Sequence, residues 1–268
     1  MANEAILPLS PRPDIRRRLS YRIGNMQGVG SRARQEDSFT VVNAFDVMQS
    51  LQKGLFITVC DGMGGMKDGK LASETAIRSF RNSFSMLDCQ GNIDEQLEKA
   101  VYQASSEVEA AIGGDGGSTV VAGIIYQEKL SYVSVGDSFF YLFRNGVLNR
   151  INREHNLCHQ KYLDVVRDGY MDPGNYHEDE EANALTEFLG MIGLDDVDAS
   201  VRPLPLMEGD ILLLCSDGVG GVLSEEEIIN ILSLRSEQEM CRQMESAVLA
   251  HKRKHQDNYT ALIVKCVY

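Results

Sequence analysis

The distribution of hydrophobic residues along the chain predicts groups of strands separated by helices. Runs that are rich in β-branched and aromatic residues, and bounded by glycine and polar residues, are typical of strands. The runs are "SYRIGNMQ", "SFTVVNAF", "GLFITV", "STVVAGIIY", "KLSYVSV", "FFYLFRNG", "VLNRI", "GDILLLCS" and "YTALIVKCVY".

Other segments have apolar residues at helical spacing. The first two predicted helices follow "GLFITV", and their apolar faces are Ala72, Ala76, Phe80, Phe84 and Leu87, then Leu97, Val101, Ala104, Val108 and Ala111. Two more are predicted in "SEEEIINIL" and "EQEMCRQMESAVLAHKRK". Ser224 and Glu227 open the third helix as a capping box. Two helix pairs among antiparallel strands indicate an α+β domain with helical layers over a β core.

Turn residues join these elements. Residues 113–117, "GGDGG", predict a helix C-cap and hinge. Gln127-Glu128 and Asn145-Gly146 predict hairpin turns. We therefore expect residues 118–151 to form an antiparallel meander. The acidic stretch from about Cys158 to Asp198 has little periodicity, and a loop of that length is typical of a lid, a binding element or a mobile segment.

Composition and charge limit the possible partners. The chain has 268 residues, 43% of them hydrophobic, and a formal net charge of −13. This charge disfavours binding to nucleic acid or to anionic membranes. No apolar run is long enough for a membrane helix, and the six cysteines have no disulfide-type spacing. We expect one cytoplasmic domain at residues 20–268 after an N-terminal tail at 1–19.

Five aspartates stand at strand ends or interruptions. They are Asp37, Asp61, Asp137, Asp217 and Asp257. Asp-Gly after a β-type run is also an ordinary turn signal, so a single copy such as "CDGMGG" decides nothing. "CSDGVGG" repeats the pattern after a second apolar run. Loops at one rim of a sheet scaffold commonly carry binding groups.

Aspartates brought to one rim must either acquire raised pKa values or bind cations. Carboxylate and carbonyl oxygens suit Mg²⁺ or Mn²⁺, and no convincing His/Cys set indicates zinc. Two such ions can generate a bridging hydroxide that attacks phosphorus. The predicted chemistry is phosphoester hydrolysis, which also needs a cation for the phosphate oxygens. Arg32 and Arg34 are both candidates.

Seven motifs, in order, resemble those of the metal-dependent type 2C serine/threonine protein phosphatase family over about residues 21–268. They are "SRARQEDSF", "VCDGMGG", "GSTVVAGII", "VSVGDSFFYLFRNG", "NALTEFLG", "LLLCSDGVGG" and "HQDNYTALIV". The "DGMGG" form is similar to that of bacterial members. The resemblance implies a central antiparallel β-sandwich with helix pairs on both faces, a four-layer αββα arrangement. It also implies a variable flap at about residues 158–190.

The resemblance further implies roles for individual residues. Arg32 would grip the phosphate, and Asp37 and Asp61 would share the catalytic site with it. The ligands of two Mn²⁺ or Mg²⁺ ions would be Asp37, Asp61, the Gly62 carbonyl, Asp217 and Asp257. Asp137 would bind a third, weaker ion together with Asp217, as in bacterial relatives. Glu36 and Asn258 would support the ligands.

Three positions depart from the family pattern. Gln35 replaces an asparagine and keeps a side-chain amide. Phe139 replaces an arginine that commonly follows Val-Gly-Asp-Ser. Met63 stands where animal relatives place a histidine proposed as general acid. None of these changes removes an implied ligand of the metal pair.

The predicted function is hydrolysis of phosphoserine and phosphothreonine in proteins. The implied partners are phosphorylated proteins, and the enzyme would oppose a serine/threonine kinase as a monomer. An alternative is a catalytically weak or inactive regulatory module that binds phosphoprotein. A third hypothesis narrows the substrate to one anti-sigma-antagonist-type phosphoserine protein, although Arg32 stands in the motif of the kinase-opposing branch.

Overall fold

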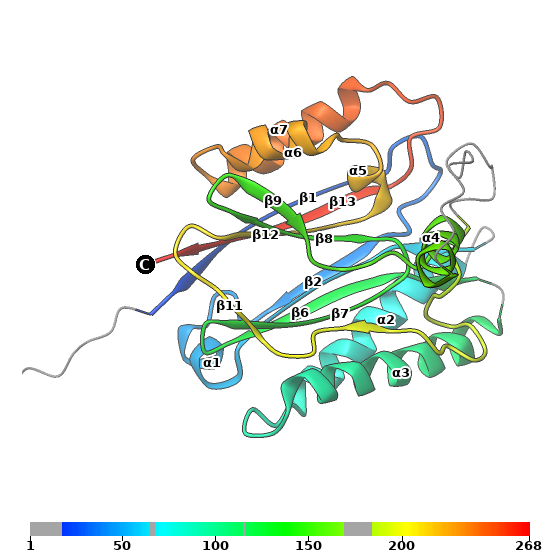
Figure 1. Cartoon of the computed structure of the whole chain (residues 1–268), viewed down its shortest axis with the longest axis horizontal. Coiled ribbons are helices and arrows are strands. Elements are labelled where there is room, and N and C mark those ends of the chain that lie inside the picture. The colour runs from blue at the N-terminus through cyan, green and yellow to red at the C-terminus, as the bar shows by residue number, and fades with distance from the viewer. Residues whose placement is uncertain (1–17, 65–67, 115, 169–183) are drawn as a thin grey trace, which may run out of the picture.

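Two antiparallel sheets lie face to face, and helices cover the outer face of each (Figure 1). The computed structural model describes residues 18–64, 68–114, 116–168 and 184–268. The layers confirm the predicted α+β sandwich with helix pairs on both sides. The expected N-terminal tail, apart from residues 18 and 19, and residues 169–183 of the expected flap lie outside the described residues.

The first sheet combines the two ends of the chain. Its strand order is β1-β13-β12-β8-β9. The strands are β1 (Ser20–Gly28), β13 (Tyr259–Val267), β12 (Ile211–Cys215), β8 (Phe139–Arg144) and β9 (Val147–Arg150). The β1–β13 ladder pairs Ser20 with Val267 and Gly28 with Tyr259.

The second sheet is built mainly from the first half of the chain. Its order is β10-β7-β6-β3-β2, and β11 also pairs with β7. The strands are β10 (Asp198–Ala199), β7 (Lys129–Val135), β6 (Val120–Tyr126), β3 (Leu55–Cys60), β2 (Ser38–Val42) and β11 (Leu204–Pro205). A short ladder of β4 (Gly62–Met63) and β5 (Gly117–Ser118) stands beside it.

The central strands are apolar on both faces because both faces are covered. In β12, Leu212 and Leu214 belong to the core between the two sheets. Ile211 and Leu213 point the other way, into the core beneath the helices. Successive side chains of a strand alternate between faces, so a strand between two apolar layers reads as an unbroken hydrophobic run.

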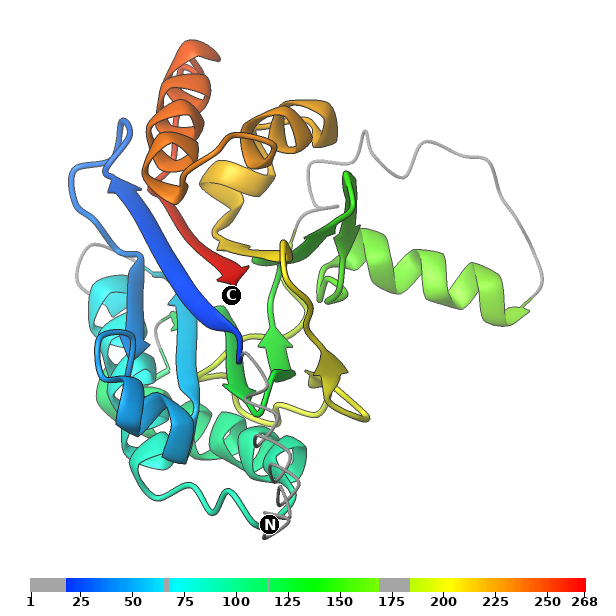
Figure 2. The same cartoon turned by 90° about the vertical axis from the view of Figure 1, so that its left-hand side faces the viewer.

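Helix pairs form the two outer layers (Figures 1 and 2). Helices α2 (Asp68–Ser85) and α3 (Ile93–Ile112) cover the second sheet. Helices α6 (Glu225–Leu232) and α7 (Glu237–Ala250) cover the first. Ser224 and Glu227 make the predicted capping box at the start of α6. Met240 and Met244 of α7 are fully buried in this layer.

The predicted meander over residues 118–151 is wrong. Strands β6 and β7 form a hairpin in the second sheet, whereas β8 and β9 form a hairpin in the first. The chain changes sheet at residues 136–138, where Gly136 has a φ of +100°. Glycine adopts such a backbone without a Cβ penalty, which permits the sharp bend. Both predicted hairpin turns are confirmed, with positive φ at Gln127-Glu128 and Asn145-Gly146.

Three helices were absent from the sequence-based prediction. They are α1 (Val47–Lys53), α4 (Leu157–Asp168) and the short α5 (Asp217–Gly220). The stretch 158–198, expected to be a loop, thus begins within α4, which stands out from the side of the sandwich (Figure 2). None of the helices in the described part of the chain is long and apolar enough to cross a membrane.

Candidate active site

Two predicted site acids leave neighbouring strands of the second sheet at the same edge. The register of β2 and β3 pairs Ser38 with Cys60, so Asp37 and Asp61 are the next residues outward from one pair. The backbone of Asp61 is held from the other side by Thr119. The Asp61 N–H donates to the Thr119 hydroxyl at 3.1 Å, and the Thr119 N–H donates to the Asp61 carbonyl at 2.8 Å.

The first sheet contributes two more acids at the same edge. Cys215 of β12 pairs with Ala261 of β13, which brings Asp217 and Asp257 to one end of the two strands. Asp137 lies in the segment that crosses between the sheets. The crossing therefore places the fifth acid between the acid pairs of the two sheets.

The other four acids gather around Asp61. Its carboxyl group is close enough to those of Asp37 and Asp217 to affect their pKa values. Asp137 and Asp257 are also close enough for their charges to raise the pKa of Asp61. The aspartates that the sequence predicts to converge are brought together by the fold.

Burial and mutual repulsion raise the pKa values of Asp37, Asp61, Asp137 and Asp217. Burial is the largest cause for each of these four. It raises the pKa of Asp37 to about 6 and that of Asp137 to about 7. The pKa of Asp61 is raised well above its usual range by burial and then by the charges of Asp37 and Asp217. The pKa of Asp217 is raised by burial and by the charge of Asp257.

This arrangement fits divalent cations. Among the residues that the structure describes, no N–H or O–H group reaches Asp37 Oδ1 or Asp217 Oδ1, although both oxygens are buried. Buried carboxylate oxygens normally have partners, and a cation would supply one while removing the repulsion between the acids. Oxygen-only ligands suit Mg²⁺ or Mn²⁺ better than zinc.

Some of these oxygens are also engaged by protein donors. Among the described residues, no three His, Cys, Asp or Glu side chains already stand as a set of metal ligands. Asp37 Oδ2 accepts hydrogen bonds from the hydroxyl groups of Ser216 at 2.9 Å and Thr260 at 2.7 Å. Asp257 forms an ion pair with Arg32. A cation at this site would share Asp257 with Arg32.

Arg32 lies at the edge of the acid cluster on a loop that Asn258 holds in place. The buried Asn258 side chain donates to the carbonyl oxygens of Val29 and Arg34, both at 2.9 Å. Its Oδ1 accepts the N–H of Glu36 at 2.7 Å. Asn258 therefore fixes the loop on both sides of Arg32. The Arg32 side chain is 59% exposed, so its guanidinium faces solvent as well as Asp257.

Glu36 and Gly62 occupy a tightly packed position beside this loop. The Glu36 carbonyl accepts a hydrogen bond from Ser73 of α2 at 2.5 Å. A Cβ on Gly62 would lie 2.0 Å from the carbonyl oxygen of Gly69 and 2.7 Å from that of Glu36. Only glycine fits there, so the "DGMGG" turn can follow Asp61 only with glycine at this position.

Sequence reasoning assigned no role to Lys70, which the structure places against the site. Its Nζ donates to the carbonyl oxygen of Asp37 at 3.0 Å and to the Ser38 hydroxyl at 3.1 Å. Lys70 also pairs with Glu74 one turn later, at 3.5 Å. Lys70 is the last residue of "CDGMGGMKDGK", but its position in the sequence does not show that α2 directs it toward Asp37.

Arg150 was also missed, and it stands beside the Phe139 departure. Its guanidinium lies 4.0 Å from the centre of the Phe139 ring. The same group donates to the carbonyl oxygens of Asp137 at 3.3 Å and Ser138 at 3.4 Å, and it pairs with Glu154. The guanidinium of Arg150, on β9, thus holds the Asp137 turn in place, although residue 139 is a phenylalanine and has no positive charge.

Comparisons with known proteins identify the family of this chain. Residues 21–161 match the family model described as protein phosphatase 2C. The chain is 30% identical to the serine/threonine phosphatase stp of Listeria innocua over 229 residues, which cover 82% of this chain and 87% of that protein.

Solved structures share the fold. PppA, described as a key regulatory component of the type VI secretion system in Pseudomonas aeruginosa, superposes with a TM-score of 0.73 at 26% identity. The match covers 92% of this chain and 98% of PppA. The catalytic domain of the phosphatase PstP, solved with two manganese ions, has a TM-score of 0.73 at 24% identity, with 93% and 100% of the two chains covered. The chain belongs to the protein phosphatase 2C family and is a type 2C protein serine/threonine phosphatase.

Proposed function

We propose that this enzyme hydrolyses phosphoserine and phosphothreonine in proteins with two divalent cations, Mn²⁺ or Mg²⁺, bound in the acid cluster. The groups that would hold them are the carboxylates of Asp37, Asp61, Asp217 and Asp257 and the carbonyl oxygen of Gly62. When bound, the two ions would supply an activated water as the nucleophile and neutralise charge on the phosphoryl group. The manganese ions of the related PstP domain support a two-ion site.

Arg32 is proposed to bind the phosphate oxygens. A guanidinium has five N–H donors in a planar fork, so it can contact phosphate while one edge faces a carboxylate. Asp257 orients the Arg32 side chain, and Asn258 and Glu36 hold the loop that carries it. The exposure of Arg32 supports this role, since an incoming phosphoryl group can reach it.

Asp137 is proposed to bind a third, weaker ion together with Asp217. The charge of Asp217 raises the pKa of Asp137, which supports their being close enough to share a cation. Arg150 braces the backbone of this turn, so the Asp137 carboxylate is presented by a fixed loop. We further propose a single catalytic domain from about residue 20, acting as a cytoplasmic monomer that opposes a serine/threonine kinase.

The observation that carries the proposal is the convergence of four other aspartates on Asp61. The test is hydrolysis of phosphothreonine, phosphoserine and phosphotyrosine peptides during Mn²⁺ and Mg²⁺ titrations. We expect metal-dependent turnover of the first two peptides. Asp61→Asn should lower kcat more than about 100-fold, because loss of even an outer partner of a metal site costs about 10- to 100-fold.

Glu226→Gln is the matched control, since it removes one negative charge from an exposed position on α6. Its kcat should equal that of the wild type. Turnover that survives both a chelator and Asp61→Asn would contradict the proposal. Metal binding by calorimetry without turnover of any phosphopeptide would favour the regulatory-module alternative.

A further inference from the structure

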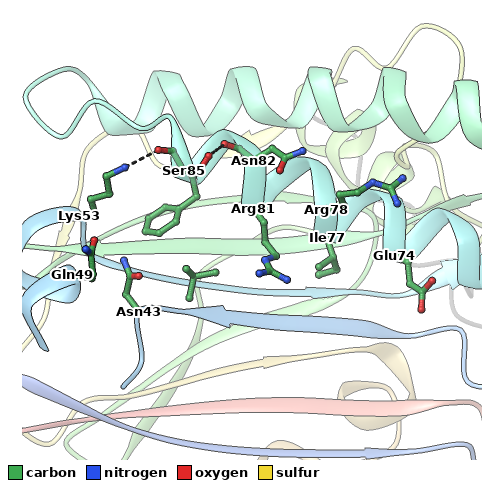
Figure 3. Close-up of a pocket in the computed structure, with 11 residues that line it drawn as sticks. Asn43, Gln49, Lys53, Glu74, Ile77, Arg78, Arg81, Asn82 and Ser85 are labelled. Atoms are coloured by element: carbon green, nitrogen blue, oxygen red, sulfur yellow. Dashed lines mark hydrogen bonds between the residues drawn. The ribbon is translucent and has the colours of Figure 1, made fainter. Parts of the chain in front are cut away.

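A groove runs along α2 from the acid cluster to α1. Its larger part has a volume of about 600 Å³ and lies between α2 and the β2–α1 segment (Figure 3). A smaller hollow of about 260 Å³ is lined by Asp37 and Lys70. The two hollows share Glu74 and Ile77, so they adjoin each other along α2 and are together called the groove.

The groove is basic, in contrast to the rest of the protein. Lys53, Arg78 and Arg81 line its larger part, together with a single carboxylate, Glu74. Figure 3 shows the two arginines on α2 between Lys53 at one end and Glu74 at the other. The whole chain carries a net charge of −13, so the charge of the groove is opposite in sign to that of the protein as a whole.

These cations are not neutralised by protein carboxylates. Within the described part of the chain, none of the three forms an ion pair. Arg78 donates to the Thr75 hydroxyl at 3.1 Å, and Lys53 donates to the Ser85 carbonyl at 2.7 Å. Both acceptors are neutral, which leaves the positive charges available to an anionic partner.

The dimensions of the groove suit an extended peptide. Lys70 and Ser85 are 15 residues apart on α2, which corresponds to about 22 Å along a helix axis. An extended chain covers that length in about seven residues. Ile77 and Phe84 line the floor of the groove but are largely buried in the core, so the polar and charged side chains supply most of its accessible surface.

We propose that this groove binds an acidic, extended segment of the phosphoprotein substrate while the phosphorylated residue occupies the acid cluster. The inference rests on the proposed function. It adds a specificity rule, which is that carboxylates within about seven residues of the phosphorylated side chain increase kcat/KM. A short acidic segment matches three cations in a groove, whereas a long polyanion would be repelled by the charge of the whole protein.

The test uses three substrates with the wild-type enzyme and Mn²⁺. Two are phosphothreonine peptides that share a core and carry either acidic or neutral eight-residue extensions on both sides. The third is a small aryl phosphate. We expect kcat/KM for the acidic peptide to exceed that for the neutral peptide by about 10-fold at low salt, and the ratio to fall toward one as ionic strength rises.

The double variant Arg78→Glu/Arg81→Glu should abolish or invert this ratio, through KM rather than kcat. Arg242→Glu is the control, because it makes one charge reversal of the same kind at an exposed position on α7, on the other face of the sandwich. It should leave the ratio unchanged.

Each outcome separates the docking proposal from the proposed function. Absence of turnover on all three substrates would contradict the proposed function itself. Equal kcat/KM for the two peptides, or a ratio that the groove variant does not change, would overturn the docking proposal alone. A groove variant that loses turnover of the aryl phosphate as strongly as that of the acidic peptide would also overturn it, because the arginines would then act on the site rather than on a substrate segment.

Discussion

The acid cluster and the basic groove adjoin each other along β2 and α2, but they hold their charges in opposite ways. Four of the acids, Asp37, Asp61, Asp137 and Asp217, are largely withdrawn from water, and their pKa values are raised. The groove cations Arg78 and Arg81 are exposed, and within the described residues neither forms an ion pair. Several negative charges buried close together destabilise the fold. A cation that binds among them relieves this repulsion, which favours its binding. Exposed charge costs little and gives selective but weak contacts.

After Asp61→Asn, the greatest loss of activity is expected at Arg32, the cation beside the acid cluster. Arg32→Ala should lower kcat/KM for a small aryl phosphate about 100-fold, since removing one preorganised donor to a developing charge costs about 100- to 1,000-fold. Arg32→Lys should recover part of the loss because it restores charge without the planar fork. The measurement is steady-state kinetics with saturating Mn²⁺.

Arg34→Ala is the matched control for Arg32, because the sequence pattern made both arginines candidates for the phosphate contact. Its kcat/KM should stay within about twofold of the wild type, a difference below 0.5 kcal/mol. If the Arg34 variant loses as much activity as the Arg32 variant, the proposal that Arg32 alone of the two arginines contacts the phosphate is wrong.

A second prediction concerns the cost of the buried acids. The pKa of Asp137 is about 7 in the folded protein and starts from an ordinary value of 3.8. A carboxyl group with a raised folded pKa stabilises the fold most below its unfolded pKa, and that contribution is lost as pH rises through the folded value. Metal-free wild type should therefore lose stability relative to Asp137→Asn between about pH 4 and pH 7.

The difference should reach a few kcal/mol above pH 7, because one pKa unit corresponds to about 1.4 kcal/mol, and it should then remain constant. Denaturant unfolding with chelator, from pH 4 to pH 8.5, measures it. Saturating Mn²⁺ should stabilise the wild type and reduce the difference, because a ligand that binds only the folded state adds to its stability. If the difference in free energy of unfolding between the two proteins is independent of pH, the charge of Asp137 does not destabilise the fold.

The smallest expected effect lies in the groove. Arg81→Glu should change the free energy of unfolding by less than about 0.5 kcal/mol, as is usual for surface positions that make no specific contact. The same denaturant experiment at pH 7 measures it. A loss above about 1 kcal/mol would mean that the groove arginine supports the fold, and the contrast between the two regions would fail.

The elements that could be predicted from sequence are those whose faces are buried. Helices α2, α3, α6 and α7 each bury an apolar stripe against a sheet, which creates the periodic signal. Helix α1 buries no residue, and α4 exposes Tyr162, Leu163 and Val166. Neither helix shows one apolar face directed at a core, so the pattern of apolar residues did not reveal them.

The meander failed for a related reason. Alternation and turn residues describe one strand and its immediate neighbour, whereas a change of sheet depends on what both sheets bury. Gly136 allows the bend, but the choice of partner for β8 is decided by β12, which lies about 70 residues later in the chain. The contact of Arg150 with the Asp137 turn follows from the same crossing and could not be read from spacing.

The residues that could act in catalysis and those that form the layers of this phosphatase can be recognised in the sequence. They are acids at strand ends, glycines beside them, an arginine before the first acid and unbroken apolar runs, all of which depend on neighbouring residues. Three further facts come from the folded structure: the acids meet at Asp61, Asp257 pairs with Arg32, and a basic groove adjoins the site. Those facts depend on strand register and on helix packing between segments far apart in the chain, where electrostatic and steric terms are set by distance in space rather than by position in sequence.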